Sequence, residues 1–370
     1  MAARISGRLN EDEEISVKKL SVCVLFGGMS PEHEVSLRSA ESVLNHLDPN
    51  KYNIVPVGIT KAGDWYIYGG TDYSKLPTGE WLHHPDNRRA AISPVRSQGL
   101  LSFEGDCVVR ERLDVVFPVL HGENGEDGAM QGLLQLAGIP YVGPHVSASA
   151  VSMDKTLTKL VMDHVAIPQA KWHLVRNSDL KSRMDRILDL LEKKFDYPMF
   201  VKPAGTGSSV GVSKAADRGA LEAALLAAGR YDEKILVEEF IHGREIEVAV
   251  MGNRNPVASI CGEIDSGAEF YDYDAKYITD TSTAYVPARI PEDVAEQVRE
   301  LAVKAYTALG CQGLSRVDFF VTYEDNRIVF NEINTLPGFT SISMYPKLFE
   351  ASGIPYGELV DELLKLALEA

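Results

Sequence analysis

Residues 200–214, FVKPAGTGSSVGVSK, contain the glycines of a phosphate-binding loop but fit neither of the two familiar nucleotide motifs. The P-loop pattern fails because Val212 follows Gly211 where that motif needs lysine, and the dinucleotide pattern G-x-G-x-x-G fails by one residue. A dinucleotide-binding turn opens a helix at once. Here the residues after Gly207 alternate and are β-branched, and helical spacing begins only near Asp217. The loop is therefore predicted to join two strands.

A hairpin rich in glycine and serine can fold over a triphosphate and offer it backbone N–H and hydroxyl donors. Lys202, on the strand that enters the loop, adds a positive charge. The other interpretation is a mobile surface hairpin with no ligand, and the loop alone does not decide between the two.

The rest of the chain alternates strand-like and helix-like segments, which predicts an α/β (α+β) protein with three parts. Residues 1–18 are expected to be a flexible tail. Residues 19–146 are predicted to form a parallel-sheet domain, interrupted by a polar region rich in Gly, Pro and Trp up to about residue 105. Residues 147–238 hold the glycine loop, and residues 239–370 are rich in strands.

Composition narrows the function classes. The formal net charge of −16, from 53 acidic and 37 basic side chains, would repel a nucleic-acid backbone, and no basic patch is visible. No apolar run suggests a signal peptide or a membrane span. Four scattered cysteines form no metal motif and are expected to fill apolar space in a reducing compartment. We therefore expect a cytoplasmic enzyme that binds neither nucleic acid nor membrane.

Polar residues interrupt two apolar runs near the C-terminus, SRVDFFV and IVFNEIN. Arg316, Asp318, Glu332 and Asn334 alternate in pairs, so on two adjacent strands all four side chains would emerge on one face. Burying these groups is costly unless they meet counter-charges. Carboxylate and amide oxygens are ligands that Mg²⁺ prefers, which favours a metal site over a salt-bridge network around Arg316.

The segment ILVEEFIHGREIEV supplies further carboxylates, Glu238, Glu245 and Glu247. Acidic side chains cannot grip phosphate, so beside the other parts they suggest hydrogen bonds to a nucleotide's adenine amine or ribose hydroxyls. For Glu239 or Glu247 alone, a solvated strand end is the simpler interpretation.

Taken together, these pieces resemble the D-alanine:D-alanine ligases, which have the three-domain ATP-grasp fold. The matching motifs run in family order from about residue 19 to the end: FGGMSPEHEVSLRSA, HGENGEDG, SMDK, VKPAGTGSSVG, VEEFIHGREIEV, FYDYDAKY, RVDFF and NEINTLPGFTSIS. Two of the stretches, GEDGAMQG and EINTLPGFTS, are too long to match by chance.

The resemblance implies a reaction and its partners. ATP and two D-alanine molecules would give D-alanyl-D-alanine, ADP and phosphate through an acyl phosphate, for peptidoglycan synthesis. Two Mg²⁺ ions, for which Mn²⁺ can substitute, would assist, and the enzyme would be a homodimer. Positioning and charge compensation dominate such phosphoryl transfers, so no covalent nucleophile is needed.

The resemblance also implies roles for residues around the amino acids. Glu34, assisted by His121, would hold the ammonium of the first D-alanine. Ser208 and Tyr277 would join that glutamate in a hydrogen-bonded set between the glycine loop and FYDYDAKY. Arg316 would stabilise the tetrahedral oxyanion. Ser343 and the backbone of Met344 would bind the carboxylate of the second D-alanine.

A second group would hold the nucleotide and metal. Lys155, Lys202 and Lys276 would contact the phosphates, aided by the loop residues Ser208 and Ser209. Glu238 would bind adenine and Glu245 the ribose. The two metal ions would be held by Asp318, Glu332 and Asn334.

The sequence departs from the family pattern in places. Glu239 and Phe240 stand where relatives often carry Lys-Trp, and AGTG replaces an Arg-Glu pair of some relatives. Met344 stands where leucine is frequent, a volume-conserving change.

Three other functions fit parts of the sequence. A D-alanine:D-lactate or D-alanine:D-serine ligase is the nearest, and Tyr277 argues against the lactate form. A non-catalytic ATP-binding regulator would be expected to lose a metal ligand or Arg316, and none is lost. A nicotinamide dehydrogenase fails because a strand follows the glycine loop.

Overall fold

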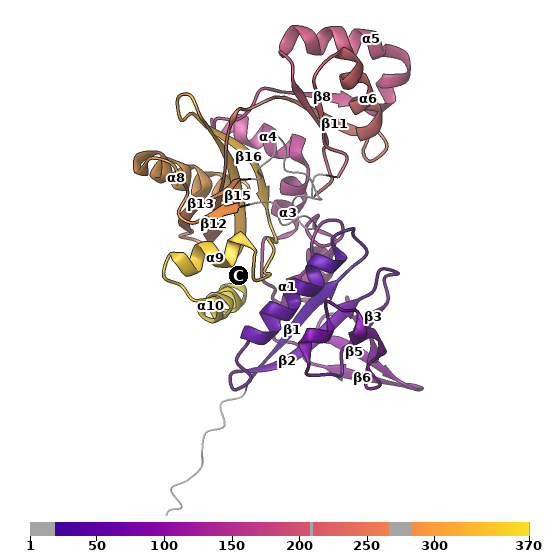
Figure 1. Cartoon of the computed structure of the whole chain (residues 1–370). Coiled ribbons are helices and arrows are strands. Elements are labelled where there is room, and N and C mark those ends of the chain that lie inside the picture. The colour runs from indigo at the N-terminus through magenta and orange to yellow at the C-terminus, as the bar shows by residue number, and fades with distance from the viewer. Residues whose placement is uncertain (1–18, 208–209, 266–282, 370) are drawn as a thin grey trace, which may run out of the picture.

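The computed structural model describes residues 19–207, 210–265 and 283–369. Three sheets organise these residues, and Figure 1 shows them as separate bodies. The N-terminal sheet lies at the bottom of the view, the sheet with α5 and α6 at upper right, and the C-terminal sheet with α8 at left. The expected tail, residues 1–18, lies outside the described residues.

The N-terminal sheet has seven strands in the order β6-β5-β4-β3-β2-β1-β7. Its centre is parallel: β1 (Leu20–Gly27) pairs with β2 (Tyr52–Ile59) on one side and β7 (Val115–Val119) on the other. These strands are continuous apolar runs because helices cover the sheet, including α1 (His33–His46) and α2 (Ala129–Ala137). The predicted parallel sheet is confirmed for this half.

The other half of the sheet is antiparallel and was not predicted. The region expected to be irregular contains the short strands β3 (Trp65–Ile67), β4 (Arg88–Ile92), β5 (Leu100–Glu104) and β6 (Cys107–Glu111), and two 3₁₀ turns, η1 (Tyr73–Lys75) and η2 (Glu80–His83). These strands lack long apolar runs, and Cys107 and Val108 of β6 are exposed, so periodicity gives a weak signal. The fully buried Trp81 anchors the region by packing edge-on against Phe26.

The second sheet, ordered β10-β9-β11-β8, carries the glycine loop. Its strands are β8 (Trp172–Arg176), β9 (Met199–Pro203), β10 (Ser213–Ala215) and β11 (Lys234–Glu239), packed with α5 (Asn177–Lys194) and α6 (Arg218–Ala228). Strands β9 and β10 pair antiparallel, so the loop joins strand to strand as predicted. Asp217 caps α6 by accepting from Ala220 N at 2.9 Å.

The third sheet is antiparallel, ordered β14-β13-β12-β15-β16. Its strands are β12 (Gly243–Met251), β13 (Val257–Asp265), β14 (Thr283–Tyr285), β15 (Leu314–Thr322) and β16 (Ile328–Asn334). Helix α8 (Glu292–Ala308) packs on one face and α9 (Met344–Ala351) on the other. Helix α10 (Tyr356–Glu369) then reaches the N-terminal domain, where Lys51 Nζ lies 2.5 Å from Asp361 Oδ2.

The stretch from residue 146 to residue 164 forms two helices. Helix α3 (Val146–Met153) ends at Asp154, which has an extended backbone (φ −84°, ψ 99°) and caps α4 (Lys155–His164) by accepting from the N–H groups of Thr156 and Leu157. This cap places Lys155 at the first position of α4, beside the glycine loop.

Candidate active site

Strands β15 and β16 bring the four predicted polar residues together. Arg316 pairs with Asn334 and Asp318 with Glu332 across the two strands. Arg316 donates from Nε and Nη2 to the two oxygens of Asp318 at 2.8 and 2.7 Å, and Asn334 Nδ2 donates to Asp318 at 2.9 Å. Glu247, from β12, adds a second carboxylate 3.2 Å from Arg316 Nε. Burial alone would lower the pKa of Arg316, but Asp318 and Glu247 raise it well above its usual range.

The donor set at this position suits a hard divalent cation. Among residues of the three described stretches, no group of three or more His, Cys, Asp or Glu side chains is arranged to hold a metal. Two carboxylates, Asp318 and Glu332, do meet here beside the amide of Asn334, and all three supply oxygen ligands. These residues therefore fit Mg²⁺ by their chemistry.

Positive charges from helix α4 and from strand β9 of the second sheet lie close to this group. Lys155 Nζ is 3.9 Å from Glu332 Oε2 and donates to Thr206 O of the glycine loop at 2.6 Å. Lys202 Nζ lies 3.4 Å from Asn331 Oδ1 on β16. The predicted phosphate-binding lysines, Lys155 of α4 and Lys202 of β9, thus lie close to β16, which carries two of the predicted metal ligands.

Glu238, near the end of β11, is buried and forms ion pairs with two lysines. Lys202 Nζ lies 2.7 Å from one of its oxygens and Lys159 Nζ 2.5 Å from the other. Burial would raise the pKa of Glu238, but the two lysines lower it to about 2. The charges of Glu238 and Glu245 both raise the pKa of Lys202, so Glu245 lies close enough to influence the same lysine.

The aromatic side chains near this point explain the departure at Glu239 and Phe240. Phe240 stacks on Phe200 with ring centroids 5.9 Å apart, and Lys214 Nζ lies 4.9 Å from the Phe240 ring. Glu239 accepts from Lys171 N at 3.0 Å and turns away from this stack. The strand end therefore offers an aromatic wall in place of tryptophan.

Two glutamates of the first glycine loop, Glu32 and Glu34, point in different directions. The Glu34 side chain is 53% exposed and forms an ion pair with Lys61. Glu32 instead faces the site: a Cβ built on Gly207 would stand 3.2 Å from Glu32 Oε2, and the Glu32 charge acts on the pKa of His121. Glu34 follows the start of α1 and points outward, whereas Glu32 precedes the helix. Of the two glutamates, Glu32 is therefore the one that lies beside the glycine loop.

His121 is buried two residues after the end of β7. Its Nδ1 donates to Leu336 O at 2.9 Å, and Ser39 Oγ lies 3.3 Å from Nε2. Burial lowers the pKa of His121 and nearby Arg316 lowers it further, while Glu32 opposes both. The ring is therefore held neutral near neutral pH.

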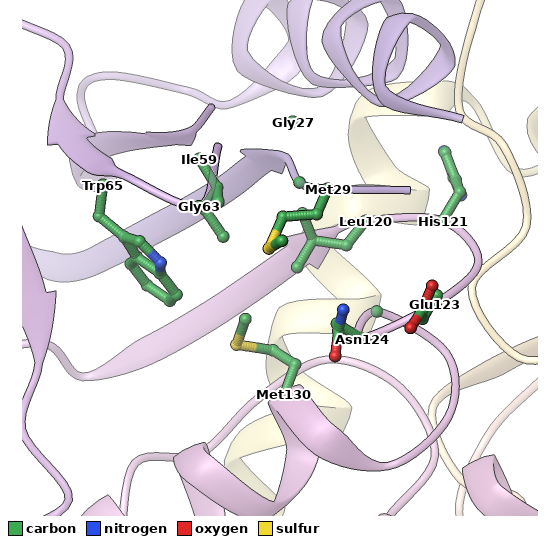
Figure 2. Close-up of a pocket in the computed structure, with 12 residues that line it drawn as sticks. Gly27, Met29, Ile59, Gly63, Trp65, Leu120, His121, Glu123, Asn124 and Met130 are labelled. Carbon is green, nitrogen blue, oxygen red and sulfur yellow. The ribbon is translucent and has the colours of Figure 1, made fainter. Parts of the chain in front are cut away.

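One face of His121 lines a cavity of about 210 Å³ in the N-terminal domain. Figure 2 shows that its other walls are mainly apolar, with Met29, Leu120 and Met130 near the centre and Trp65 at the far end. The polar atoms of His121 bond to Leu336 and Ser39, which do not line this cavity.

Ser343 and Met344 lie where α9 begins. Ser343 Oγ accepts from Thr340 N at 3.0 Å, and the Met344 side chain is buried in the core, so only its backbone could reach a ligand. Ser208, Ser209, Lys276 and Tyr277 lie outside the described residues.

Sequence reasoning missed three residues of this region: Glu32, Glu126 and Lys159. Each had a signal. Glu32 and Glu126 lie in glycine-loop motifs already singled out, and Lys159 stands four residues after Lys155, on the same face of α4.

Glu126 gives a pH-dependent prediction. Its carboxylate accepts from Gly122 N at 2.8 Å and Leu336 N at 3.0 Å, and burial together with the Glu32 charge raises its pKa to about 8. The folded protein then binds a proton between pH 4.5 and 8 that the unfolded chain releases, so this group's contribution to stability falls as pH rises through that window. Glu126→Gln, which resembles the protonated acid, should gain stability relative to wild type as pH rises from 5.5 to 8.5, on the order of 1–3 kcal/mol.

Thermal unfolding midpoints of both proteins across this pH range measure the effect. Glu123→Gln, an exposed glutamate of the same loop, is the matched control and should follow the wild-type curve. Parallel curves for wild type and Glu126→Gln would contradict the prediction.

The fold and site define the class of protein: a glycine-loop hairpin and a carboxylate-bearing sheet that face one another form an ATP-grasp ligase. Comparison with known proteins gives the family. Residues 21–144 match the model of the D-ala D-ala ligase N-terminus and residues 161–365 that of its C-terminus. The chain belongs to the D-alanine–D-alanine ligase family.

Individual relatives agree with this assignment. The chain is 50% identical to a D-alanine–D-alanine ligase from Acetivibrio thermocellus and 48% identical to one from Caldicellulosiruptor bescii, over 95% of this chain and 96% of each relative. Among solved structures, it is similar to the VanG D-Ala:D-Ser ligase from Enterococcus faecalis (TM-score 0.85, 38% identity, 95% and 100% covered). It is also similar to the D-alanine–D-alanine ligase from Coxiella burnetii (TM-score 0.82, 38% identity, 95% and 94% covered).

No helix within the described ranges is both long and apolar enough to cross a membrane.

Proposed function

We propose that the protein joins two D-alanine molecules at the expense of ATP, giving D-alanyl-D-alanine, ADP and phosphate for peptidoglycan synthesis. The observation that carries this proposal is the 3.9 Å approach of Lys155 Nζ, at the start of α4, to Glu332 Oε2 on β16, which places a phosphate-binding lysine beside the oxygen ligands of the C-terminal sheet. A nucleotide triphosphate with its metal ion needs both kinds of group within one site.

The reaction has two steps. A carboxylate oxygen of the first D-alanine attacks the terminal phosphorus of ATP, and ADP leaves. The amine of the second D-alanine attacks the acyl phosphate carbon, losing a proton, and phosphate leaves as the C–N bond forms. Lys155, Lys202 and Lys276 contact the phosphates, and Arg316 stabilises the oxyanion of the second step.

Asp318, Glu332 and Asn334 hold two Mg²⁺ ions, or Mn²⁺ in their place. The ions would neutralise charge on the transferred phosphoryl group. Glu238 faces the adenine amine and Glu245 the ribose.

The amino-acid sites lie nearer the N-terminal domain. Glu32, in place of Glu34, holds the first ammonium beside His121, and Ser208 and Tyr277 link it to the glycine loop and to residues 266–282. Ser343 and the Met344 backbone bind the second carboxylate. Support comes from Glu32 facing Gly207, the residue before Ser208.

The proposed domains are residues 19–146, 147–238 and 239–370, with ATP between the last two. The protein acts in the cytoplasm as a homodimer, which light scattering of the purified protein would test.

A D-alanine:D-serine ligase is the second candidate, because the VanG D-Ala:D-Ser ligase is a close structural neighbour. Against it, the curated relatives named above are D-alanine–D-alanine ligases. An ADP-release assay with D-alanine alone, L-alanine alone, or D-alanine plus D-serine or D-lactate, with products identified by mass spectrometry, decides. We expect D-alanyl-D-alanine as the main product. A preference for the mixed product would establish the second candidate, and no ADP release with any pair would overturn ligase activity.

A further inference from the structure

A buried triad of charges joins three elements beside the site. Lys159 of α4 is 2% exposed, Glu238 of β11 is 4% exposed, and the Lys202 side chain on β9 is 15% exposed. Lys159 Nζ lies 2.5 Å from Glu238 Oε1, and Lys202 Nζ lies 2.7 Å from Oε2. A fully buried lysine is costly without a charged partner, so its presence needs a reason.

The two lysines differ in their freedom to move. Lys202 reaches the edge of the site, where it contacts Asn331 at 3.4 Å. Lys159 is enclosed: its Nζ also lies 3.4 Å from Gln169 Oε1, and Gln169 Nε2 donates to Lys159 O at 2.9 Å and to Asp163 at 2.5 Å. Only Lys202 can turn to a phosphate without leaving a packed position.

A lysine that turns to phosphate leaves its former carboxylate behind. If Lys202 were the sole partner of Glu238, nucleotide binding would strand a buried negative charge, and breaking a buried ion pair is strongly unfavourable. Lys159 removes this cost because it stays on the other oxygen. Burial raises the pKa of Glu238, and the two lysines lower it to about 2. Of the two, the Lys159 charge lowers it more than the Lys202 charge does.

We propose that Lys159 is a positioning residue for ATP: it holds Glu238 ionised and fixed while Lys202 leaves that carboxylate for the phosphates, which frees Oε2 to accept from the adenine amine. This inference rests on the proposed function, since it assumes ATP as the ligand. It adds a residue that would touch neither the nucleotide nor the amino acids.

The test measures ATP binding directly by calorimetry, with Mg²⁺ and without D-alanine. Lys159→Met, which keeps the length but removes the charge, should weaken ATP binding by about 10- to 100-fold and raise the KM for ATP similarly, because a buried charge loses its partner. The KM for D-alanine should change by less than about 2-fold. Lys181→Met, on the exposed face of α5, is the matched control and should bind ATP as the wild type does.

Two further variants separate positioning from mere packing. In a Glu238→Gln background the carboxylate that Lys159 would hold in place is absent, so adding Lys159→Met should weaken ATP binding by less than about 2-fold more. Lys159→Arg, which keeps the charge, should retain most of the affinity. The dissociation constant of Lys159→Met should also become pH-dependent as the pKa of Glu238 rises, whereas loss of packing alone would not create a titration.

Wild-type affinity in Lys159→Met would overturn the inference, as would equal losses in the wild-type and Glu238→Gln backgrounds. If Lys159→Met does not fold, Lys159→Arg and the pH dependence of its ATP affinity carry the test: loss of binding with the charge retained overturns the proposal. Failure of the wild type to bind ATP would instead refute the proposed function.

Discussion

Glu332→Gln should reduce kcat by at least about 10³-fold while the protein stays folded. Glu332 is on β16, opposite Asp318 of β15, and its Oε2 lies 3.9 Å from Lys155 Nζ. The metal and the phosphates are proposed to meet at this point. Glutamine keeps the shape but removes the charge that binds a divalent cation, and metal ions supply several kcal/mol to such reactions, with each 1.4 kcal/mol worth about tenfold in rate. The Glu332 side chain is 28% exposed, so the thermal midpoint should move by no more than about 3 °C.

The measurement is ADP release over a range of Mg²⁺ concentrations, together with a thermal unfolding curve. Glu324→Gln makes the same change on the exposed turn between β15 and β16, and its kcat should equal that of the wild type. A Glu332→Gln enzyme with more than half the wild-type kcat at every Mg²⁺ concentration would remove Glu332 from the metal site.

Glu32→Gln should lower kcat/KM for D-alanine by about 100-fold, whereas Glu34→Gln should change it by less than about 2-fold. Glu32 faces the loop residue Gly207 and influences the pKa of His121, so its charge can meet a bound ammonium in a water-poor site. Truncating one partner of a buried charge pair costs about 2–5 kcal/mol, which converts to the stated loss. Glu34 pairs with Lys61 on the surface, where ion pairs contribute little.

Steady-state kinetics with D-alanine as the varied substrate and ATP saturating would check this pair. Both variants replace a glutamate by glutamine, at positions two residues apart where the chain enters α1. Glu34→Gln is therefore the matched control. The reverse pattern, a large loss for Glu34→Gln with little change for Glu32→Gln, would restore the original assignment and rule out the one drawn from the structure.

The face of β15 and β16 that carries the four polar residues shows how much sequence alone can predict. Alternation within SRVDFFV and IVFNEIN required Arg316, Asp318, Glu332 and Asn334 to share faces, and pairing of β15 with β16 does place them opposite one another. The glycine loop was equally predictable, because the alternating residues after it exclude a helix. Both inferences depend only on local periodicity, which the backbone obeys regardless of context.

The first glycine loop shows where such reasoning stops. Glu32 and Glu34 are two residues apart in SPEHEVSL, and nothing in the sequence pattern says which one points to the site. The direction in which the chain leaves the loop and enters α1 decides it, sending Glu34 to Lys61 on the surface. The antiparallel strands β3 to β6 were missed for a related reason, since short half-exposed strands depend on their neighbours more than on their own pattern.

By itself, the sequence determined most of the longer strands and helices, which side chains share a face, and which family the motifs resemble. Only the tertiary structure decided which faces meet: Lys159 and Lys202 on Glu238, Lys155 beside Glu332, and Glu126 between Gly122 and Leu336. The physical reason is that periodicity fixes directions within one element. The spacing between charges on different elements, which sets their pKa values and their chemistry, depends on how the sheets and helices pack.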